Sequence, residues 1–468
     1  MARSALVVTA LLTAAGCAIG PTYRKPEVEA PPQWKTTVDA RYWQPAAPRD
    51  GAPHEAWWDV FDDGRLASLE RQALEANQDI QQAIARVEQA RALARVSASE
   101  FVPSLTAEPS AQKFQRSRSG FGGAGSFKGE SYSLPFDLSY EIDLWGRVRR
   151  SFEAARAEAA ASQAAQRFVL LTVTTEVARR YFQLRQLDAE AELLHRTVEL
   201  RGRALQMAQD RAEAGMVSAL DVARAGTEMS AAEAELLDVR RRRAEVENAL
   251  AVLCGRNASG FSIEAAPLAL EALPPEIPPG LPSTLLERRP DVAEAERLLA
   301  AANAHIGVAE AGFFPVLRLT GSAGYVSGEL DSIFDSASQV WSVGPSLSLP
   351  IFAGGRNVAN LQVAKASYDE AFAAYRQRVL TAFSDVENAL ADLQWLGQQA
   401  QAQTQVVEAS RTAAKLSDSR YQQGLVNYLE SVDAERQRLQ AERGAVQILS
   451  QRLISTALLI KSLGGSWQ

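Results

Sequence analysis

The sequence is poor in the residues that build most catalytic and metal sites. It has three histidines, two cysteines and four methionines among 468 residues. His54, His195 and His305 lie far apart without ligand spacing, and the cysteines form no zinc-type cluster. The net charge of −7 leaves no basic stripe to neutralise phosphates. We therefore expect no metal, no catalytic cofactor and no nucleic acid partner.

Long apolar runs are also missing after residue 17, where no 18 consecutive apolar residues occur. Any part of the mature chain that crosses a membrane would then have to be β-structure. The apolar run at residues 5–15 follows Arg3 and ends in small residues, which indicates a secretory signal peptide. Cys17 directly after Gly16 is typical of a bacterial lipoprotein, in which this cysteine carries lipid. An ordinary signal peptide with an incidental cysteine is the alternative.

The most informative feature that is present is an internal duplication. The segment Arg211–Asp221 recurs as Arg420–Glu430, 209 positions later. Upstream, Asp79 matches Asp291 at an offset of 212. The chain therefore divides into a lipoprotein signal peptide (1–16), a Pro- and Trp-rich extended segment (17–65), a first repeat (66–255), a linker (256–282) and a second repeat (283–468).

Each repeat contains one segment that predicts a very long helix. Residues 150–213 and 357–422 lack proline and are dominated by Ala, Gln, Arg, Glu and Leu, which are strong helix formers. At 1.5 Å per residue, the second helix would be roughly 100 Å long. Its apolar residues do not follow a clean heptad, which favours a wall of several helices over a two-stranded rod. Shorter helices are expected at 66–100 and 283–312.

Between these helices, apolar and polar residues alternate with the period of a β-strand. In 133–144, for example, Leu134, Phe136 and Leu138 share one face with the other apolar residues. Such strands are typical of an outer-membrane barrel, and a soluble β-sandwich is the alternative. Four strands cannot close a barrel, and open edges cannot lie in lipid, so three chains would share twelve strands. The expected strands are at about 101–116 and 130–145 in the first repeat and at about 313–327 and 339–352 in the second.

Several motifs together identify a family. They are Gly16–Pro26, Trp57–Leu66, Glu287–Glu296 and the paired strand-to-helix elbows Asp143–Arg147 and Pro350–Arg356. In combination they resemble the TolC-like outer-membrane efflux family, in its lipoprotein (OprM/NodT-type) branch. The resemblance implies a mixed α/β membrane protein, in which a trimeric 12-stranded outer-membrane β-barrel, with four strands per chain, is continued by a long periplasmic α-helical barrel.

The resemblance also implies a function and partners. The chain would be the outer-membrane exit duct of a tripartite efflux pump, passively exporting small molecules. It would be a homotrimer, lipid-anchored and membrane-spanning, working with a periplasmic membrane-fusion adaptor and an inner-membrane RND-type transporter. A type I protein-secretion duct and a non-conducting trimeric coiled-coil scaffold or adhesin remain alternatives. An enzyme is a weaker one, with no site to support it. The exported substrate cannot be read from the sequence.

The candidate site residues lie at the tips of the long hairpins, where Gly215 and Gly424 are expected in turns. Glu430 and Asp433 are three apart on one helix face, so threefold symmetry would gather six carboxylates around an axis. The resemblance implies that these acids line the periplasmic aperture. It also implies that a hydrogen bond between Asp221 and Tyr421 ties neighbouring hairpins shut, for which a phenol donor and a carboxylate acceptor are suited. Where the family archetype has an arginine latch, this chain has Val426.

Overall fold

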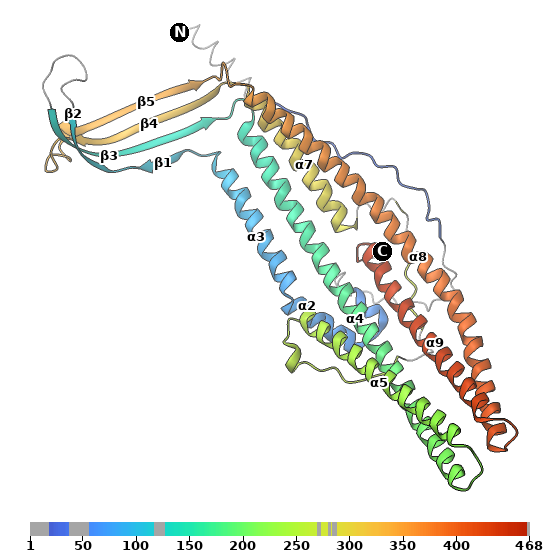
Figure 1. The fold of residues 1–468 in the computed structure, drawn as a ribbon. Helices are drawn as coiled ribbons and strands as arrows, with labels where there is room; N and C mark the ends of the chain where they lie inside the picture. Colours follow the sequence, from blue (N-terminus) through green and yellow to red (C-terminus); the bar gives the residue numbers. More distant parts are fainter. Residues whose placement is uncertain are drawn as a thin grey trace. The chain divides into compact units, whose positions relative to one another are not determined.

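The computed structural model describes residues 18–36, 56–116, 127–268, 273–278, 282 and 288–465 (Figure 1). Cys17 lies outside the described residues, so its lipidation stays a prediction. Within the described ranges, no helix is both long enough and apolar enough to cross a membrane. The chain forms two compact units, one of Met1–Glu27, Arg86–Gln163 and Glu294–Arg376, the other of Val28–Ala85, Ala164–Ala293 and Gln377–Gln468. Each unit takes segments from both repeats.

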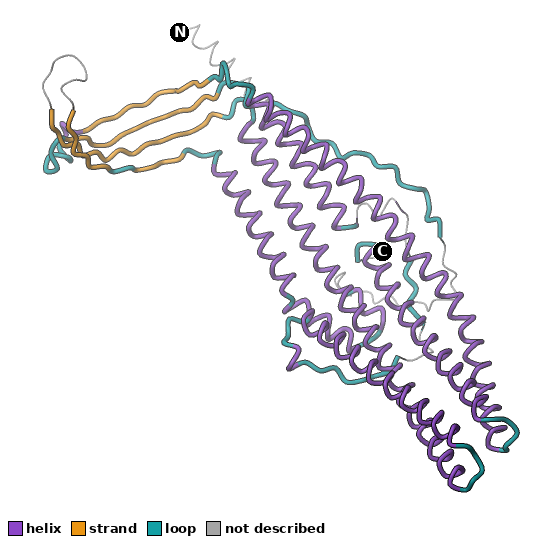
Figure 2. The backbone as a smooth tube through the Cα atoms, in the orientation of Figure 1, coloured by secondary structure: helices purple, strands orange, loops and turns teal. Residues whose placement is uncertain are grey.

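The first unit contains an antiparallel sheet, drawn in orange in Figure 2. β3 pairs with β1 and β2 along one side and with β4 along the other, and β4 pairs with β5. The predicted strand at 101–116 is in fact two strands, because Pro109 lacks the N–H that a ladder requires. Since both pair with β3, they share one place in the sheet. The strands are β1 (Ser104–Ala107), β2 (Ser110–Arg116), β3 (Phe127–Ile142), β4 (Val316–Ser327) and β5 (Gln339–Ser348).

The register of the sheet places apolar residues on one face, as the alternation predicts. Phe136 lies opposite Ala323, which lies opposite Trp341. One residue along the strands, Asp137 lies opposite Ser322. The described residues leave the apolar face uncovered: Trp341 is 79% exposed and Phe136 is 44% exposed. An exposed apolar surface of this kind requires another protein surface or a lipid to cover it.

The two predicted long helices are confirmed, each as one uninterrupted element. α4 (Arg147–Glu213) and α8 (Arg356–Gln422) both have 67 residues. Each turns back into a helix of 35 residues, α5 (Ala219–Leu253) and α9 (Tyr428–Ser462). The resulting helical hairpins are visible in Figure 1, green for the first repeat and orange to red for the second. Shorter elements are η2 (Trp57–Phe61), α2 (Gly64–Ala76), α3 (Gln78–Ser99), η3 (Ala258–Gly260), α7 (Pro290–Ala311) and η4 (Ser336–Ser338).

The helix predicted over 66–100 is interrupted at Asn77, which is a correction to the sequence-based expectation. Asn77 has an extended backbone (φ −66°, ψ 129°), so α2 ends there. Its Oδ1 accepts hydrogen bonds from the N–H groups of Asp79 and Ile80 at 2.9 and 3.2 Å. The same side chain thereby caps the start of α3. Its Nδ2 donates to the Leu253 carbonyl at 2.9 Å, which also fixes the end of α5.

The duplication is visible in the second unit as matching close contacts. Gly255, just after α5, has φ +64°, and a Cβ there would lie 2.2 Å from the Ala76 carbonyl oxygen. Its repeat mate Gly464, just after α9, has φ +88°, and a Cβ there would lie 2.8 Å from the Arg288 carbonyl oxygen. Ala76 and Arg288 are themselves 212 positions apart, the offset of the repeat. Both repeats thus join the end of one helix to the start of another in the same way.

Aromatic residues of the N-terminal segment pack against the helices, as its composition indicates. In the second unit, Trp57 is 6% exposed and its indole N–H donates to Thr174 Oγ1 at 3.1 Å. In the first unit, the Tyr23 hydroxyl donates to Glu296 Oε1 at 2.7 Å. Burial and this contact with Glu296 raise the pKa of Tyr23, so the phenol stays a donor at any physiological pH.

Candidate functional site

The tips of the two hairpins have the same backbone conformation. Gly215 and Gly424 both have φ +72°, a region that glycine enters at little cost. At the first tip, the Met216 N–H donates to the Arg211 carbonyl at 2.8 Å. The equivalent bond at the second tip, from Leu425 to the Arg420 carbonyl, is 2.9 Å. These bonds close Schellman motifs that end α4 and α8, and both glycines therefore lie in the turns where the sequence predicts them.

Glu430 and Asp433 occupy the first turns of α9, and both are exposed. The Glu430 backbone N–H donates to Asn427 Oδ1 at 3.0 Å, so the Asn427 side chain caps this helix. That carboxylate lies 3.6 Å from the Arg420 guanidinium, across the turn. Asp433 accepts a hydrogen bond from Gln437 Nε2 at 2.8 Å. Two acids near a helix N-terminus are also favoured by the helix dipole.

The Arg420–Glu430 ion pair is a contact at the second tip that the sequence reasoning did not predict. Glu430 is 52% and Arg420 is 57% exposed in their side chains, so solvent weakens the attraction to a fraction of a kcal/mol. Its value is positional, because it holds the Glu430 carboxylate close to its own turn. Both residues belong to the repeated segment, but only the conformation of the turn between them shows that their side chains meet.

Asp221 and Tyr421 have other partners than the predicted ones. Asp221 Oδ2 accepts hydrogen bonds from the Ser218 hydroxyl at 2.9 Å and the Ser218 N–H at 3.3 Å, and so closes a capping box at the start of α5. The Tyr421 ring packs on Tyr428, with centroids 5.6 Å apart, and under the Arg211 guanidinium at 5.2 Å. Within this chain the two described side chains share no hydrogen bond, so a tie between neighbouring chains stays a prediction.

The two hairpins nevertheless meet close to their tips. Tyr428, at the start of α9, is 8% exposed and packs with Ala208 and Ala225 of the first hairpin. Tyr421 and Val222 lie against the same cluster. Burial raises the pKa of the Tyr428 phenol, so it stays neutral in this contact. The cluster is therefore a small apolar contact that fixes the tip of one hairpin against the other.

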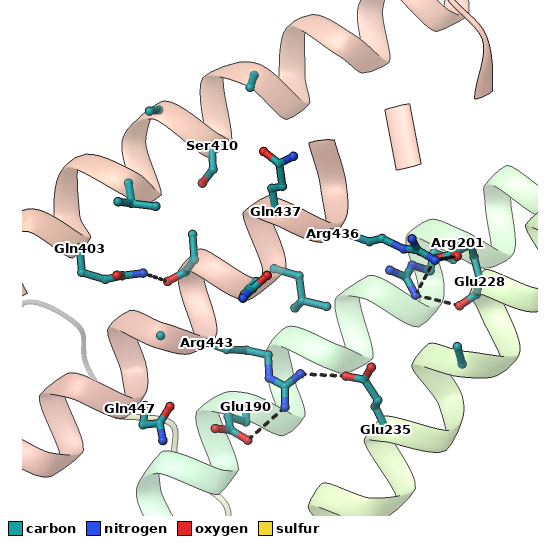
Figure 3. Close-up of a pocket in the computed structure, with 18 residues that line it drawn as sticks. Glu190, Arg201, Glu228, Glu235, Gln403, Ser410, Arg436, Gln437, Arg443 and Gln447 are labelled. Carbon is teal, nitrogen blue, oxygen red and sulfur yellow. Dashed lines mark hydrogen bonds and ion pairs between the residues drawn. The ribbon is translucent and has the colours of Figure 1, made fainter. Parts of the chain in front are cut away.

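Further from the tips, the hairpins enclose a polar groove of about 1140 Å³. Figure 3 shows its charged lining: Glu228 pairs with both Arg201 and Arg436, and Arg443 pairs with both Glu190 and Glu235. The sequence reasoning did not identify these residues. Two acids seven apart in the first repeat face two arginines seven apart in the second, and this spacing becomes a signal only once α5 and α9 are known to lie side by side.

Comparisons with known proteins agree with this geometry. The family model described as "Outer membrane efflux protein" matches residues 69–256 and 281–465, once in each repeat. The chain is 35% identical to the outer membrane protein OprJ of Pseudomonas aeruginosa over 473 residues, covering 100% of this chain and 97% of that protein. The chain belongs to the outer membrane efflux protein family.

Further similarities extend this assignment. The chain is also 35% identical to the toluene efflux pump outer membrane protein TtgI of Pseudomonas putida over 474 residues, covering 100% of this chain and 99% of that protein. The solved outer-membrane channel OprN is similar in fold, with a TM-score of 0.87 and 33% identity over 96% of this chain and 100% of that one. This outer membrane efflux protein is therefore the outer-membrane exit duct of an efflux system, with the fold of the known channels.

Proposed function

We propose that three copies of this efflux protein form one conducting duct, which works with a periplasmic adaptor and an inner-membrane transporter. The observation that carries the proposal is the open sheet of the first unit. Among the described residues, nothing pairs with the outer edges of β1 and β2 on one side or of β5 on the other, and nothing covers the apolar face. Unpaired backbone groups are too costly in lipid to remain exposed. Pairing β5 of each chain with β1 and β2 of the next removes every edge, and threefold closure gives twelve strand positions.

The hairpin tips supply a selective aperture in this arrangement. Glu430 and Asp433 are exposed and lie one helical turn apart on α9. Three copies bring six carboxylates to one opening, where a ring of acids favours cations and resists constriction. Gly215 and Gly424 allow the sharp turns behind this ring. Conduction needs no bond-making step, so the chain acts as a duct and not as an enzyme, and the energy for export comes from its pump partner.

Membership of the family indicates the class of cargo and the kinds of partner, but not their identities. TtgI is named for toluene efflux, which makes a small molecule the reasonable cargo class for this chain as well. In the proposed pump, the inner-membrane transporter selects the cargo and the adaptor joins it to the hairpin tips. The duct itself then needs only a passage of suitable width and charge.

Lipidation of Cys17 completes the proposal. The Ile19 N–H, two positions after Cys17, donates to the Trp145 carbonyl at 2.9 Å, and Arg150 Nη2 donates to the Gly20 carbonyl at 3.2 Å. Both contacts lie in the first unit, at the junction between β3 and α4. They would keep an acyl chain on Cys17 next to the membrane that the sheet crosses. Labelling with radioactive palmitate should therefore disappear in Cys17→Ser.

Conductance in planar bilayers tests the function directly. We expect the purified, detergent-extracted protein to run as a trimer and to insert as a channel with cation preference. A stable monomer, or a trimer that never conducts, would overturn the duct and favour a scaffold. If cells with the matching pump export a protein while their sensitivity to dyes and solvents is unchanged, the secretion duct is the correct assignment.

A further inference from the structure

Three ion pairs join the first-repeat hairpin to the second-repeat hairpin in the described part of the second unit. In each pair the acid belongs to the first repeat and the arginine to the second. Glu228 pairs with Arg436, and Arg443 pairs with Glu235 at 2.8 Å and with Glu190 at 3.9 Å. Figure 3 shows these side chains reaching across from the red-toned helices to the green-toned ones.

Two of these pairs form a regular ladder between α5 and α9. Both rungs join residues 208 positions apart, so the two helices run parallel at a constant register. The rungs are seven residues apart on each helix, which is two turns or about 10 Å. A spacing of seven residues keeps side chains on the same edge of two packed helices. The ladder is therefore a continuous contact edge, not a chance pair.

The charges of the ladder are not duplicated, although the repeat around them is. The two acids of the first repeat correspond to uncharged residues in the second repeat. The two arginines of the second repeat likewise correspond to uncharged residues in the first. The mates, at the repeat offset of 209, are Glu228 and Gln437, Glu235 and Gly444, Thr227 and Arg436, and Ala234 and Arg443. The two copies have thus diverged into an acidic edge and a basic edge.

This divergence determines which hairpins can pair. The two repeats have the same helix lengths and the same tip geometry, so their backbones alone allow two like hairpins to pack together. Two first-repeat helices at the observed register would place Glu228 and Glu235 opposite Thr227 and Ala234, which carry no charge. Two second-repeat helices would place Arg436 and Arg443 opposite Gln437 and Gly444. Only the unlike pair brings opposite charges together at both rungs, so it is favoured over either like pair.

We propose that the Glu228–Arg436 and Glu235–Arg443 ladder is a pairing key, which makes α5 prefer a helix of the α9 type over a second copy of itself. The preferred partner of the acidic edge is a parallel helix with arginines seven residues apart. In an assembly of several chains, where similar hairpins lie side by side, the key favours alternation of first-repeat and second-repeat hairpins. The inference concerns folding and assembly and does not depend on conduction.

Charge exchange at the second rung tests this key, because Glu235 is 52% exposed and tolerates a new side chain. The full-length protein is compared as Glu235→Gln, Glu235→Arg, Arg443→Glu and the double exchange Glu235→Arg with Arg443→Glu. The readouts are the folded fraction by circular dichroism on heating and the mass of the particle by light scattering. We expect about a twofold loss in the folding equilibrium for Glu235→Gln and about fivefold for Glu235→Arg, the range for exposed pairs.

The double exchange decides the matter. It should recover more than half of the loss caused by Glu235→Arg, although the new glutamate at position 443 then lies near Glu190. Glu245→Arg is the matched control, because Glu245 pairs with Arg241 on the same helix at 2.6 Å and at a similar exposure of 63%. Arg443→Glu should not rescue this control. A double exchange no more stable than Glu235→Arg alone, or equal rescue of the control, would overturn the key. Conduction is a separate readout, so a failure of the proposed duct would leave this result intact.

Discussion

The two hairpins have the same backbone geometry but different side chains at their tips. The comparison distinguishes an acid that stabilises its own helix from an acid that is a candidate for the aperture. Both have a helix of 67 residues, a glycine with φ +72° and a returning helix of 35 residues. At the first tip, Asp221 caps its own helix with Ser218. At the second tip, the Asn427 side chain caps the helix by accepting from the Glu430 N–H, and the carboxylate of the repeat mate Glu430 lies 3.6 Å from the Arg420 guanidinium. One backbone position thus holds an acid that caps its own helix in one copy and an exposed acid that faces Arg420 in the other.

The largest predicted effect on stability compares Arg289 with its first-repeat mate Asn77, 212 positions earlier. Arg289 donates to Asp291 at 2.9 and 2.7 Å, and the Asp291 side chain is only 2% exposed. Arg289→Met should therefore cost about 3–5 kcal/mol, because it leaves a buried carboxylate without its partner. The first-repeat position Asn77 carries no charge, and Asn77→Ala should cost only about 1–2 kcal/mol through lost capping bonds. Denaturant titration of the detergent-solubilised protein measures both, and equal losses would contradict the comparison.

Close backbone contacts give the second prediction. Gly255→Ala places a Cβ against the Ala76 carbonyl and strains a backbone with φ +64°, so it should cost about 2–4 kcal/mol. Gly464→Ala should cost less, because its closest contact is 2.8 Å and not 2.2 Å. Gly215→Ala is the control for strain alone, at about 1 kcal/mol, because its φ is +72° and no atom lies within 4 Å. If Gly215→Ala destabilises as much as Gly255→Ala, strain and not contact determines the loss.

Some elements of this fold could be predicted from the sequence and others could not. The long helices were predictable because proline is absent from α4 and α8 over many turns. The strand alternation was predictable because one face is apolar throughout. The break at Asn77 was missed, because an asparagine in an Ala-rich window is only weakly unfavourable for a helix. Pro109 is the signal in the sequence for the split of the first strand, because proline has no N–H to donate to a β-ladder.

The ion pairs between the two hairpins could not be predicted from the sequence, for a different reason. Glu228 and Arg436 are 208 residues apart, and their contact depends on the packing of α5 against α9. α5 and α9 carry many other glutamates and arginines at similar spacings, so the local sequence does not show that Glu228 and Arg436 form a pair. The repeat offset narrows the choice only once the two helices are known to lie side by side. The position of Asp221 in a capping box, in contrast, follows from the Ser218–Asp221 spacing and was predictable.

The third prediction compares the repeat mates Asp221 and Glu430 directly. Glu430→Gln with Asp433→Asn should leave the stability within about 0.5 kcal/mol, because both side chains are exposed. It should lower the ratio of cation to anion permeability in planar bilayers by about twofold or more, because the ring of charge at the opening is removed. Asp221→Ala should do the reverse, costing about 1 kcal/mol of stability with little change in selectivity. Unchanged selectivity in the acid double variant would place the constriction elsewhere.

The smallest effect on stability is expected at Tyr421, whose repeat mate is Ala212. Tyr421→Phe keeps the ring that packs on Tyr428 and under Arg211, and it removes only a hydroxyl that has no bond to Asp221 in this chain. Thermal stability should stay within about 0.5 kcal/mol. If that hydroxyl donates to Asp221 of a neighbouring chain, each lost bond is worth about 1 kcal/mol, and three copies shift closure by about 3 kcal/mol. The open fraction would then rise roughly a hundredfold, since 1.4 kcal/mol is a tenfold change. Single-channel recording measures it, and an unchanged open probability would remove the tie while leaving the ring of Glu430 and Asp433 as the remaining candidate for the gate.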